Sequence, residues 1–362
     1  MCHLVLHDLS LGLNQFRLDK ISLSIKKGEY HILLGPSGSG KSSLIKSILG
    51  FYNVESGYIW CDGREITKEL PESRRIGYVP QSFALFSHMS VEENIRYGMR
   101  MTDMTNDEAD KYFNRLVDVL GIRHLCSRKT DNLSGGEKQR VAIGRSLGMK
   151  PDTILLDEPF SAIDENNKRM LWYELKQIID EFNVTVLHVT HNLEEAEILG
   201  DRLSLMINGK IIQTDDCMDF FKFPVNEAAA RYLNYRNIFK GKVDSLNPKS
   251  IIIHDNFILK VAGDLPDKET VTVCINPLNI RIIDDDCHCD NTAAYTNQYS
   301  GLIVNFLQLL EYNLLWFRFA GSTNKYDLEI KCPGYADQYS NIYIGKKIRI
   351  GLREPDIICY SG

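Results

Sequence analysis

The apolar segment YHILL at residues 30–34 is followed by the glycine-rich GPSGSGKS at 35–42 and then by SLIKSIL at 43–49. The middle segment matches the pattern G-x-x-x-x-G-K-[S/T], and its place between a strand and a helix makes the match specific. Its glycines let backbone N–H groups wrap around an anion, and the helix that follows adds free N–H groups and the positive end of its dipole. A chance glycine–serine turn is the alternative, but it would need neither flanking element. The sequence therefore predicts a phosphate-binding loop.

Two side chains of this loop have separate expected roles. Lys41 is expected to neutralise the β and γ phosphates of a nucleotide, and the Ser42 hydroxyl to bind Mg²⁺. The residues expected to bind the nucleotide through this loop are Gly35, Pro36, Ser37, Gly38, Ser39, Gly40, Lys41, Ser42 and Ser43.

The composition sets limits on the kind of protein. A length of 362 residues predicts two domains, and a formal charge of −6, from 42 basic and 48 acidic residues, argues against a broad nucleic-acid surface. No apolar run reaches the length of a membrane-spanning helix, and the N-terminus lacks the pattern of a secretory signal, so any membrane role is expected to come through a partner. Nine cysteines without a CxxC pair are typical of reduced thiols in a cytoplasm.

Residues 1 to about 235 alternate short apolar strands with amphipathic helices. This pattern predicts an α/β domain with a largely parallel sheet. A more polar stretch, about 88–150, has helical spacing without a strand signal and is expected to form a helical subdomain. The expected strands are 30–34, 76–79, 153–156 and 184–189.

Residues 236–362 have a different sequence pattern, in which short runs of alternating apolar and polar residues are separated by turn residues. This pattern predicts an all-β domain of small-barrel type. A weak sequence similarity between the segments that begin at Gly241 and Gly301 suggests two tandem modules.

An apolar strand at 153–156 ends in two acids, Asp157 and Glu158. Both carboxylates are expected at the carboxyl edge of the sheet, where the phosphate loop also lies. Asp157 suits the role of Mg²⁺ ligand, and Glu158 that of the general base that polarises a water for attack on the γ phosphate. An acidic pair alone is more often a solvated turn, but beside a phosphate loop the catalytic interpretation is favoured.

His191 and Gln81 complete the predicted catalytic group. His191 ends another apolar strand and is interpreted as a γ-phosphate contact, with an ordinary loop histidine as the alternative. His188 is expected to pack within that strand, and a zinc pair is disfavoured because an odd spacing sends the two rings to opposite faces. Gln81 follows the strand at 76–79 and is interpreted as a mobile Mg²⁺ or water ligand.

The sequence also predicts a second anion-binding helix start, although one domain binds only one γ phosphate. In LSGGEKQR at 133–140, Ser134 suits a helix N-cap and Glu137 completes a capping box. Two glycines in the first turn cost helix stability, so their presence suggests the close approach of another group.

Taken together, these ordered motifs resemble the ATP-binding cassette family over residues 1 to about 220. The resemblance implies ATP and Mg²⁺ as ligands and a head-to-tail homodimer, in which the signature of one copy closes on the nucleotide of the other. It assigns Ser161 and Asp164 to the dimer-contacting D-loop. The signature residues that it implies act in trans are Leu133, Ser134, Gly135, Gly136 and Glu137.

One position departs from the family pattern. The family usually places an aromatic residue near the N-terminus to stack on adenine, and by spacing that place falls near Leu13. Phe16, three residues further on, is therefore the candidate for this contact; apolar contact alone is the alternative.

Residues 237–360 resemble the C-terminal regulatory (TOBE/MOP-like) domain of importer ATPases. The short runs 14–18, 97–101 and 235–239 look most similar to molybdate or tungstate importers. This resemblance implies uptake of an oxyanion, molybdate or tungstate and also sulfate, with other cargoes (ferric iron, sugar or polyamine) and a non-transport cassette ATPase as alternatives. It further implies two transmembrane permease subunits, an extracytoplasmic solute-binding protein, no nucleic acid, and a peripheral position on the cytoplasmic face of the cell membrane. The apolar segment 83–89 is a candidate socket for a permease helix, with ordinary internal packing as the alternative.

The segment DDDCHCD at 284–290 also contains metal-ligand residue types, including Cys287, His288 and Cys289. No second cluster completes four ligands, so a solvated loop is the favoured interpretation.

Overall fold

The structure is a computed structural model that describes residues 2–13, 16–161, 163, 165–254, 257–263, 265, 269–283, 294–334 and 342–361. The chain divides into two compact units, Met1–Lys222 and Phe223–Gly362, and each is described by itself. Helix α8 (Glu227–Tyr232) belongs to the second unit, because its buried alanines pack on that unit's strand β14. The sequence predicts a boundary near Tyr235, whereas the compact units divide after Lys222.

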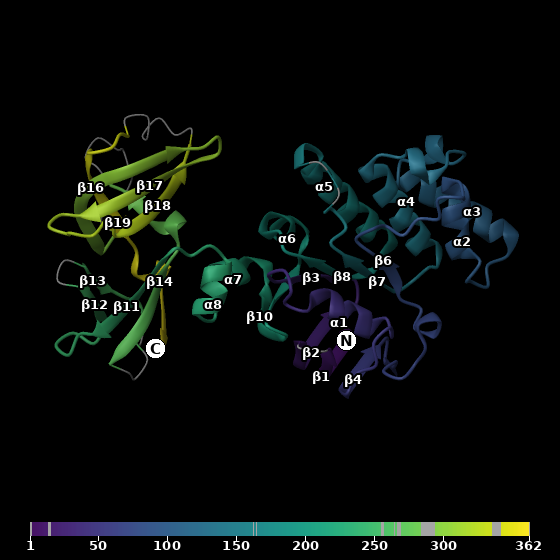
Figure 1. Ribbon diagram of the computed structural model, residues 1–362, viewed down its shortest axis with the longest axis horizontal. Helices are drawn as coiled ribbons and strands as arrows, with labels where there is room; N and C mark the ends of the chain where they lie inside the picture. The colour runs from purple at the N-terminus through teal and green to yellow at the C-terminus, as the bar shows by residue number, and fades with distance from the viewer. Residues whose placement is uncertain are drawn as a thin grey trace. The chain divides into compact units, whose positions relative to one another are not determined.

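The first unit is built on a central six-stranded sheet of order β10-β9-β3-β8-β7-β6 (Figure 1). All neighbours are parallel except the edge pair β9–β10. Strands β3, β7 and β8 are buried along their whole length, which explains their continuous apolar sequences. The bounds are β3 (Tyr30–Leu34), β6 (Gly77–Val79), β7 (Thr153–Asp157), β8 (Thr185–Thr190), β9 (Arg202–Ile207) and β10 (Lys210–Asp216).

A second, antiparallel sheet of order β2-β1-β4-β5 lies outside the strands expected from the sequence. Its inward residues share one core with helix α1 (Lys41–Ile48) and with residues of β3, β7 and β8. Helix α1 therefore packs between two sheets, and this packing fixes the position of the helix start that follows the phosphate loop. The bounds are β1 (Cys2–Leu13), β2 (Phe16–Lys26), β4 (Ser56–Cys61) and β5 (Arg64–Glu65).

The expected helical subdomain is present between β6 and β7. It contains α2 (Val91–Met99), α3 (Asn106–Val119) and α4 (Gly135–Gly148), and each of the three begins with a serine or threonine capping box. The remaining helices of this unit are α5 (Glu165–Phe182), α6 (Leu193–Leu199) and α7 (Cys217–Lys222).

The second unit contains two five-stranded antiparallel sheets around one shared core. Strand β20, the last of the chain, completes the sheet of the first half, while β15 joins the sheet of the second half. The expected fold class, an α/β cassette followed by an all-β unit, is confirmed. The bounds are β11 (Asn237–Val243), β12 (Ser250–His254), β13 (Phe257–Lys260), β14 (Thr270–Ile275), β15 (Arg281–Ile282), β16 (Asn297–Gln308), β17 (Tyr312–Phe319), β18 (Leu328–Pro333), β19 (Lys347–Leu352) and β20 (Ile357–Ser361).

Neither a membrane-spanning helix nor a metal-binding cluster is found among the residues that the structure describes. No helix in them is long and apolar enough to cross a membrane. No group of three or more His, Cys, Asp or Glu side chains in them could hold a metal ion. The segment with Cys287, His288 and Cys289 lies outside the described residues.

Candidate functional site

The predicted site residues follow four strands that are adjacent in the central sheet. Strand β3 leads into the phosphate loop, β8 into His191, β7 into Asp157 and Glu158, and β6 into the turn with Gln81. Because these strands are parallel, their carboxyl ends meet at one edge of the sheet, which is where ligands bind in such folds.

The phosphate loop needs glycine at two positions. Gly38 and Gly40 have φ angles of 80° and 103°, in the left-handed region that other residues rarely adopt. Gly40 is also the N-cap of α1 and provides no side-chain cap, so the first N–H groups of the helix remain available. Ser39 is buried, and its hydroxyl has no hydrogen-bond partner among the described residues. The loop is thus a preformed anion cradle.

Lys41 folds back over this loop. Its ammonium group donates to the carbonyl oxygens of Gly35 at 2.7 Å and Pro36 at 3.0 Å. Burial lowers the pKa of Lys41, while Glu158 and Asp157 nearby act to raise it. The lysine is therefore held at the loop by carbonyls that phosphate oxygens can replace.

Ser42 and Asp157 meet as the sequence predicts. The Ser42 hydroxyl donates to Asp157 Oδ1 at 3.0 Å, and Tyr78 lies on β6, which pairs with the strand that carries Asp157. Burial raises the pKa of Asp157, with Ser42 acting in the opposite direction, and burial raises the pKa of Tyr78 to about 12. A hydroxyl oxygen beside one carboxylate suits Mg²⁺, which takes its remaining ligands from water and phosphate. The residues present fit the ion.

The raised pKa of Asp157 leads to a stability prediction. Because the unfolded chain gives up this proton more readily, stability falls as pH rises from the unfolded pKa through the folded pKa, and above the folded pKa the charged carboxylate destabilises the fold. Asp157→Asn removes the charge and keeps an oxygen that can accept from Ser42. In the absence of nucleotide, we expect the melting temperature of the cassette to rise by about 2 °C.

Differential scanning calorimetry at neutral pH checks this expectation. Asp152→Asn is the matched control, because that carboxylate is exposed and should leave the melting temperature unchanged. A lower melting temperature for Asp157→Asn than for Asp152→Asn would contradict a buried charge that destabilises the fold.

Glu158 faces His191. Its Oε1 lies 3.1 Å from His191 Nδ1, and the backbone N–H of Glu158 donates to the Val189 carbonyl at 2.9 Å. Glu158 has a φ angle of 47°, an uncommon backbone conformation that typically marks functional sites. Its side chain is 21% exposed, so the carboxylate is fixed in place yet open to water.

Further predicted site residues are Gln81, Ser161 and Asp164. Gln81 lies exposed in the turn after β6, at the same sheet edge. Ser161 donates through both its N–H and its hydroxyl to the Glu158 carbonyl, so it supports the segment that carries the general-base candidate. Asp164 lies outside the described residues.

Phe16 packs on the phosphate loop. A Cβ placed on Gly40 would lie 2.4 Å from Phe16 Cζ, and one on Gly209 would lie 3.3 Å from the same atom. Leu13 and Phe16 are both partly buried against the core that contains α1. Phe16 therefore remains the aromatic candidate for adenine, with part of its ring already covered by the loop.

The predicted capping box at the start of α4 is confirmed. The backbone N–H of Ser134 donates to Glu137 Oε2 at 2.7 Å, and that of Glu137 donates to Ser134 Oγ at 3.3 Å. Leu133 is buried just before the cap. Gly136 is open on its outer side, since a Cβ there would meet only the side chain of Leu171, at 3.4 Å.

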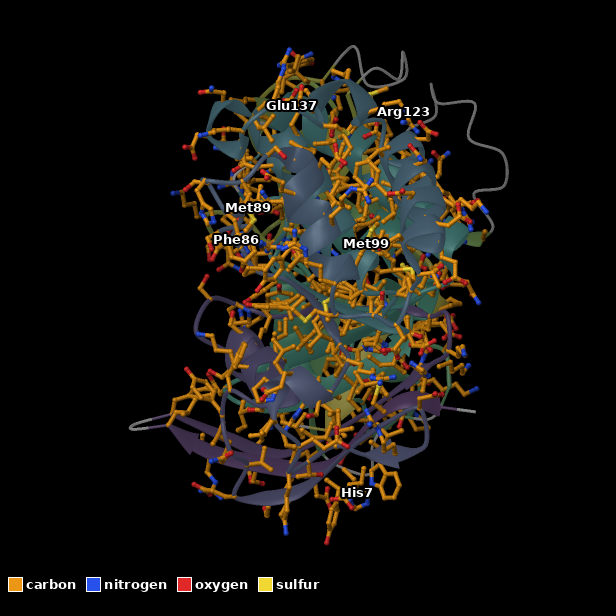
Figure 2. The ribbon with its side chains drawn as sticks, turned by 90° about the vertical axis from the view of Figure 1, so that its right-hand side faces the viewer. His7, Phe86, Met89, Met99, Arg123 and Glu137 are labelled. Carbon is orange, nitrogen blue, oxygen red and sulfur yellow. The ribbon has the colours of Figure 1, made fainter. Side chains whose placement is uncertain are left out.

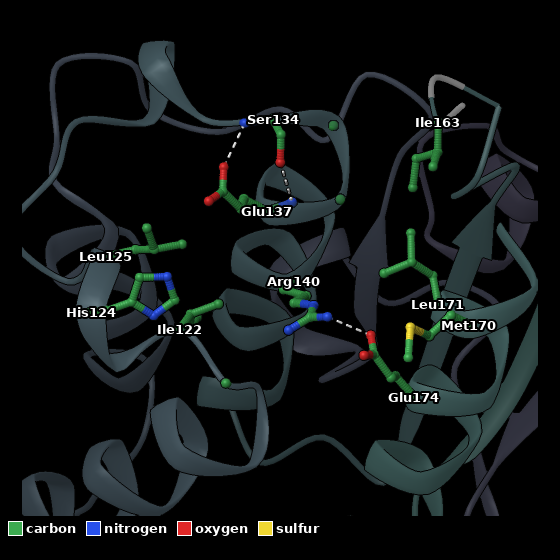
Figure 3. A pocket seen from close by; sticks show the side chains of 13 residues that line it. Ile122, His124, Leu125, Ser134, Glu137, Arg140, Ile163, Met170, Leu171 and Glu174 are labelled. Atoms are coloured by element: carbon green, nitrogen blue, oxygen red, sulfur yellow. Dashed lines mark hydrogen bonds and ion pairs between the residues drawn. The ribbon is translucent and has the colours of Figure 1, made fainter. Parts of the chain in front are cut away.

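This helix start forms one wall of a pocket of about 550 Å³. Figure 3 shows Ser134 and Glu137 on that wall, the ion pair of Arg140 with Glu174 across it, and His124 on the other side. Apolar side chains complete the lining, namely Ile122, Leu125, Ile163, Met170 and Leu171.

The segment 83–89 is held by α4. Arg145 donates to the carbonyl of Ala84 at 2.6 Å and to that of Phe83 at 3.1 Å, and both of these residues have positive φ angles. Phe83 is buried, whereas Phe86 and Met89 are partly exposed at the margin of the cassette (Figure 2). Part of this segment packs internally and part remains available to a partner. The contact of Arg145 was not found from the sequence, because no local pattern links residues so far apart.

Comparison with known proteins gives a consistent set of relatives. The family model described as "ABC transporter" matches residues 18–161. The chain is 43% identical over 233 residues to the molybdate/tungstate import ATP-binding protein WtpC of Pyrococcus abyssi, covering 64% of this chain and 68% of that protein. It is 40% identical to the protein of the same name from Methanocaldococcus jannaschii, over 70% of this chain and 82% of that protein. It is 36% identical to the spermidine/putrescine import ATP-binding protein PotA of Thermotoga maritima, over 65% of this chain and 64% of that protein.

Solved structures match about three fifths of the chain. The dimeric structure of a post-hydrolysis state of an ATP-binding cassette, bound to ADP and Pi, is 28% identical with a TM-score of 0.52; the match covers 59% of this chain and 98% of that one. Another cassette of an ABC transporter is 26% identical with a TM-score of 0.57, over 64% of this chain and 98% of that one.

Proposed function

The chain belongs to the ATP-binding cassette family of transporter ATPases, and on that premise we propose that two copies of it hydrolyse ATP to drive an importer of molybdate or tungstate. The observation that carries the ATPase function is the meeting of three motifs at one edge of the central sheet. Ser42 contacts Asp157 at 3.0 Å, and Glu158 contacts His191 at 3.1 Å, so the phosphate loop, the acids and the histidine form one site.

Binding of ATP begins at the loop. The N–H groups of residues 35–43 and the start of α1 surround the phosphates, and Lys41 exchanges the carbonyls of Gly35 and Pro36 for phosphate oxygens. Phe16 offers its remaining ring surface to adenine. Ser42, Asp157 and Gln81 would hold Mg²⁺, which neutralises charge on the phosphate oxygens when bound.

Hydrolysis depends on Glu158. Its carboxylate is positioned to orient a water for in-line attack on the γ phosphate and to accept the proton of that water. His191 keeps the carboxylate in place through their contact and reaches toward the same phosphate.

The signature is proposed to act on the nucleotide of a second copy. Each chain has two helix starts that suit an anion, at Lys41 and at Gly135, but only one of them has a lysine and a magnesium site beside it. A head-to-tail homodimer resolves this mismatch, because residues 133–137 of each copy then close on the ATP held by the other. Ser161 and Asp164 are proposed to contact the partner at the same interface.

The cargo is inferred from the relatives. The molybdate/tungstate import proteins are 40–43% identical to this chain, whereas the polyamine import proteins are 35–36% identical. We therefore favour an oxyanion importer with two permease subunits and an extracytoplasmic solute-binding protein. The chain would attach to the cytoplasmic face of the membrane through the partly exposed segment 83–89. The second unit, all-β with one core, is proposed to be a TOBE-type regulatory domain.

Reconstitution with its permease subunits tests this function. ATP-dependent accumulation of tungstate in vesicles is expected, with spermidine and sulfate as competing cargoes. The cargo assignment would be overturned by uptake of spermidine but not tungstate. Isolation of the chain with ribosomes or DNA, and without hydrophobic subunits, would overturn transport altogether.

A further inference from the structure

A chain of buried polar side chains lies directly behind His191. It consists of Tyr30 on β3, His188 and Thr190 on β8, and Glu195 on α6, and is called the buried relay below. The Tyr30 hydroxyl lies 2.9 Å from His188 Nδ1, His188 Nε2 lies 2.8 Å from Glu195 Oε1, and the Thr190 hydroxyl donates to Glu195 Oε2 at 2.8 Å. None of the four residues is more than 4% exposed.

The contacts of the His188 ring differ in kind. Burial raises the pKa of Tyr30 well above its usual range, so its hydroxyl stays protonated beside His188 Nδ1. The other ring nitrogen of His188 faces Glu195. That approach is close without being an aligned hydrogen bond, so Thr190 supplies the one aligned donor side chain described for this carboxylate.

Stability alone does not account for this arrangement. Buried ionic groups are often no more stabilising than apolar side chains of similar volume, and the neighbouring positions of β8 are filled by valine and leucine. The ring of Phe160, two residues beyond Glu158, also lies near that of His188, with the centroids 6.1 Å apart and the planes tilted by 36°. The buried relay therefore touches the segments that carry both members of the Glu158–His191 pair.

Both neighbours of His191 in the chain are tied to the relay. The Thr190 hydroxyl accepts from the backbone N–H of Asn192 at 3.1 Å. The Asn192 side chain in turn accepts from the N–H groups of Glu194 and Glu195, at 2.9 and 3.1 Å, and so caps α6. The backbone at His191 is thus held between two residues that share hydrogen bonds with Glu195.

We propose that the buried relay is a positioning element for His191, which it holds against Glu158 without itself touching the nucleotide. The proposal rests on the proposed ATPase function. Loosening the relay at Thr190 should slow the hydrolytic step and leave ATP binding nearly intact, because the Thr190 hydroxyl bonds to Glu195 and Asn192 and not to the phosphate loop or Lys41.

Three variants of the full chain test this inference. Thr190→Val keeps the shape of the side chain but removes both the bond to Glu195 and the bond from Asn192. Thr190→Ser restores the hydroxyl. Thr185→Val is the matched control, since Thr185 lies on the same strand, is equally buried, and uses its hydroxyl to accept from the Gly28 N–H at 3.0 Å.

Steady-state ATPase assays and thermal unfolding give the first readout. We expect Thr190→Val to lower kcat about tenfold with KM for ATP changed less than about twofold, and Thr190→Ser to return kcat to near wild type. Thr185→Val should lose comparable thermal stability and keep kcat. The inference is overturned if Thr185→Val and Thr190→Val have the same kcat, or if Thr190→Ser is as slow as Thr190→Val.

Crystal structures of the threonine variants give a readout that does not need turnover. The 3.1 Å contact of His191 with Glu158 should be lost in Thr190→Val and present in Thr190→Ser. A wild-type chain without ATPase activity would refute the proposed function, while these structures would still decide the role of the relay. An unchanged contact in Thr190→Val would refute the positioning role.

Discussion

Glu158→Gln should lower the rate of ATP hydrolysis by about 10²- to 10⁴-fold, the range typical for loss of a general base. The amide has nearly the shape of the carboxylate, but it cannot accept a proton from water. The phosphate loop, Lys41 and Ser42 are unaffected by the change, so ATP should still bind. In the proposed homodimer the ATP lies between the two copies and holds them together, so a variant that binds ATP without hydrolysing it should accumulate as an ATP-bound dimer.

Two measurements on Glu158→Gln check this expectation: single-turnover ATP hydrolysis, and sedimentation velocity with and without ATP. Glu181→Gln is the control, since this acid is exposed and its ion pair with Arg115 is a surface contact of small energetic weight. Turnover of Glu158→Gln within about tenfold of Glu181→Gln would remove Glu158 from the role of base.

The second large effect concerns two variants that should be inactive for different reasons. Lys41→Met removes the ammonium group that meets the phosphates and should weaken ATP binding by about 10²-fold or more, as expected when charge-assisted hydrogen bonds are lost. Gly136→Asp should leave ATP binding intact and reduce hydrolysis by a similar factor. Its carboxylate stands where a phosphate should approach.

The fold should tolerate Gly136→Asp. A Cβ at this position meets Leu171 at 3.4 Å, an ordinary contact, and an acid in the first turn of α4 is favourable to the helix. Binding of a fluorescent ATP analogue separates the two variants, and Lys68→Met, an exposed lysine, is the control for Lys41→Met. Loss of nucleotide binding in Gly136→Asp alone would place the signature on the nucleotide of its own chain.

The candidate site could be predicted in large part because its residues follow strands. Each predicted catalytic residue stands just after a short apolar run, and parallel strands bring such positions to one edge whatever the intervening loops do. The capping box at Ser134 was predictable for a similar reason, since its partners are three residues apart.

Contacts that depend on packing between distant segments were not predictable. His188 was expected only to pack in its strand, and it does so, but its contacts with Tyr30 and Glu195 arise from the pairing of β3 with β8 and the docking of α6. The contact of Phe16 with the phosphate loop likewise depends on the antiparallel sheet, which the strand expectations did not include. The unit division at Lys222 rather than near Tyr235 reflects the packing of α8 on β14, which no local pattern shows.

Mixing the two inactive variants shows whether each copy completes the site of the other. In a mixed dimer of Lys41→Met with Gly136→Asp, one site combines both defects and the other combines an intact phosphate loop with an intact signature. Random mixing in equal amounts should therefore restore about a quarter of wild-type ATPase activity, since half of the dimers are mixed and each has one intact site. If the mixture stays as inactive as its two components while mixed dimers form, the signature does not act across the interface and the account is wrong.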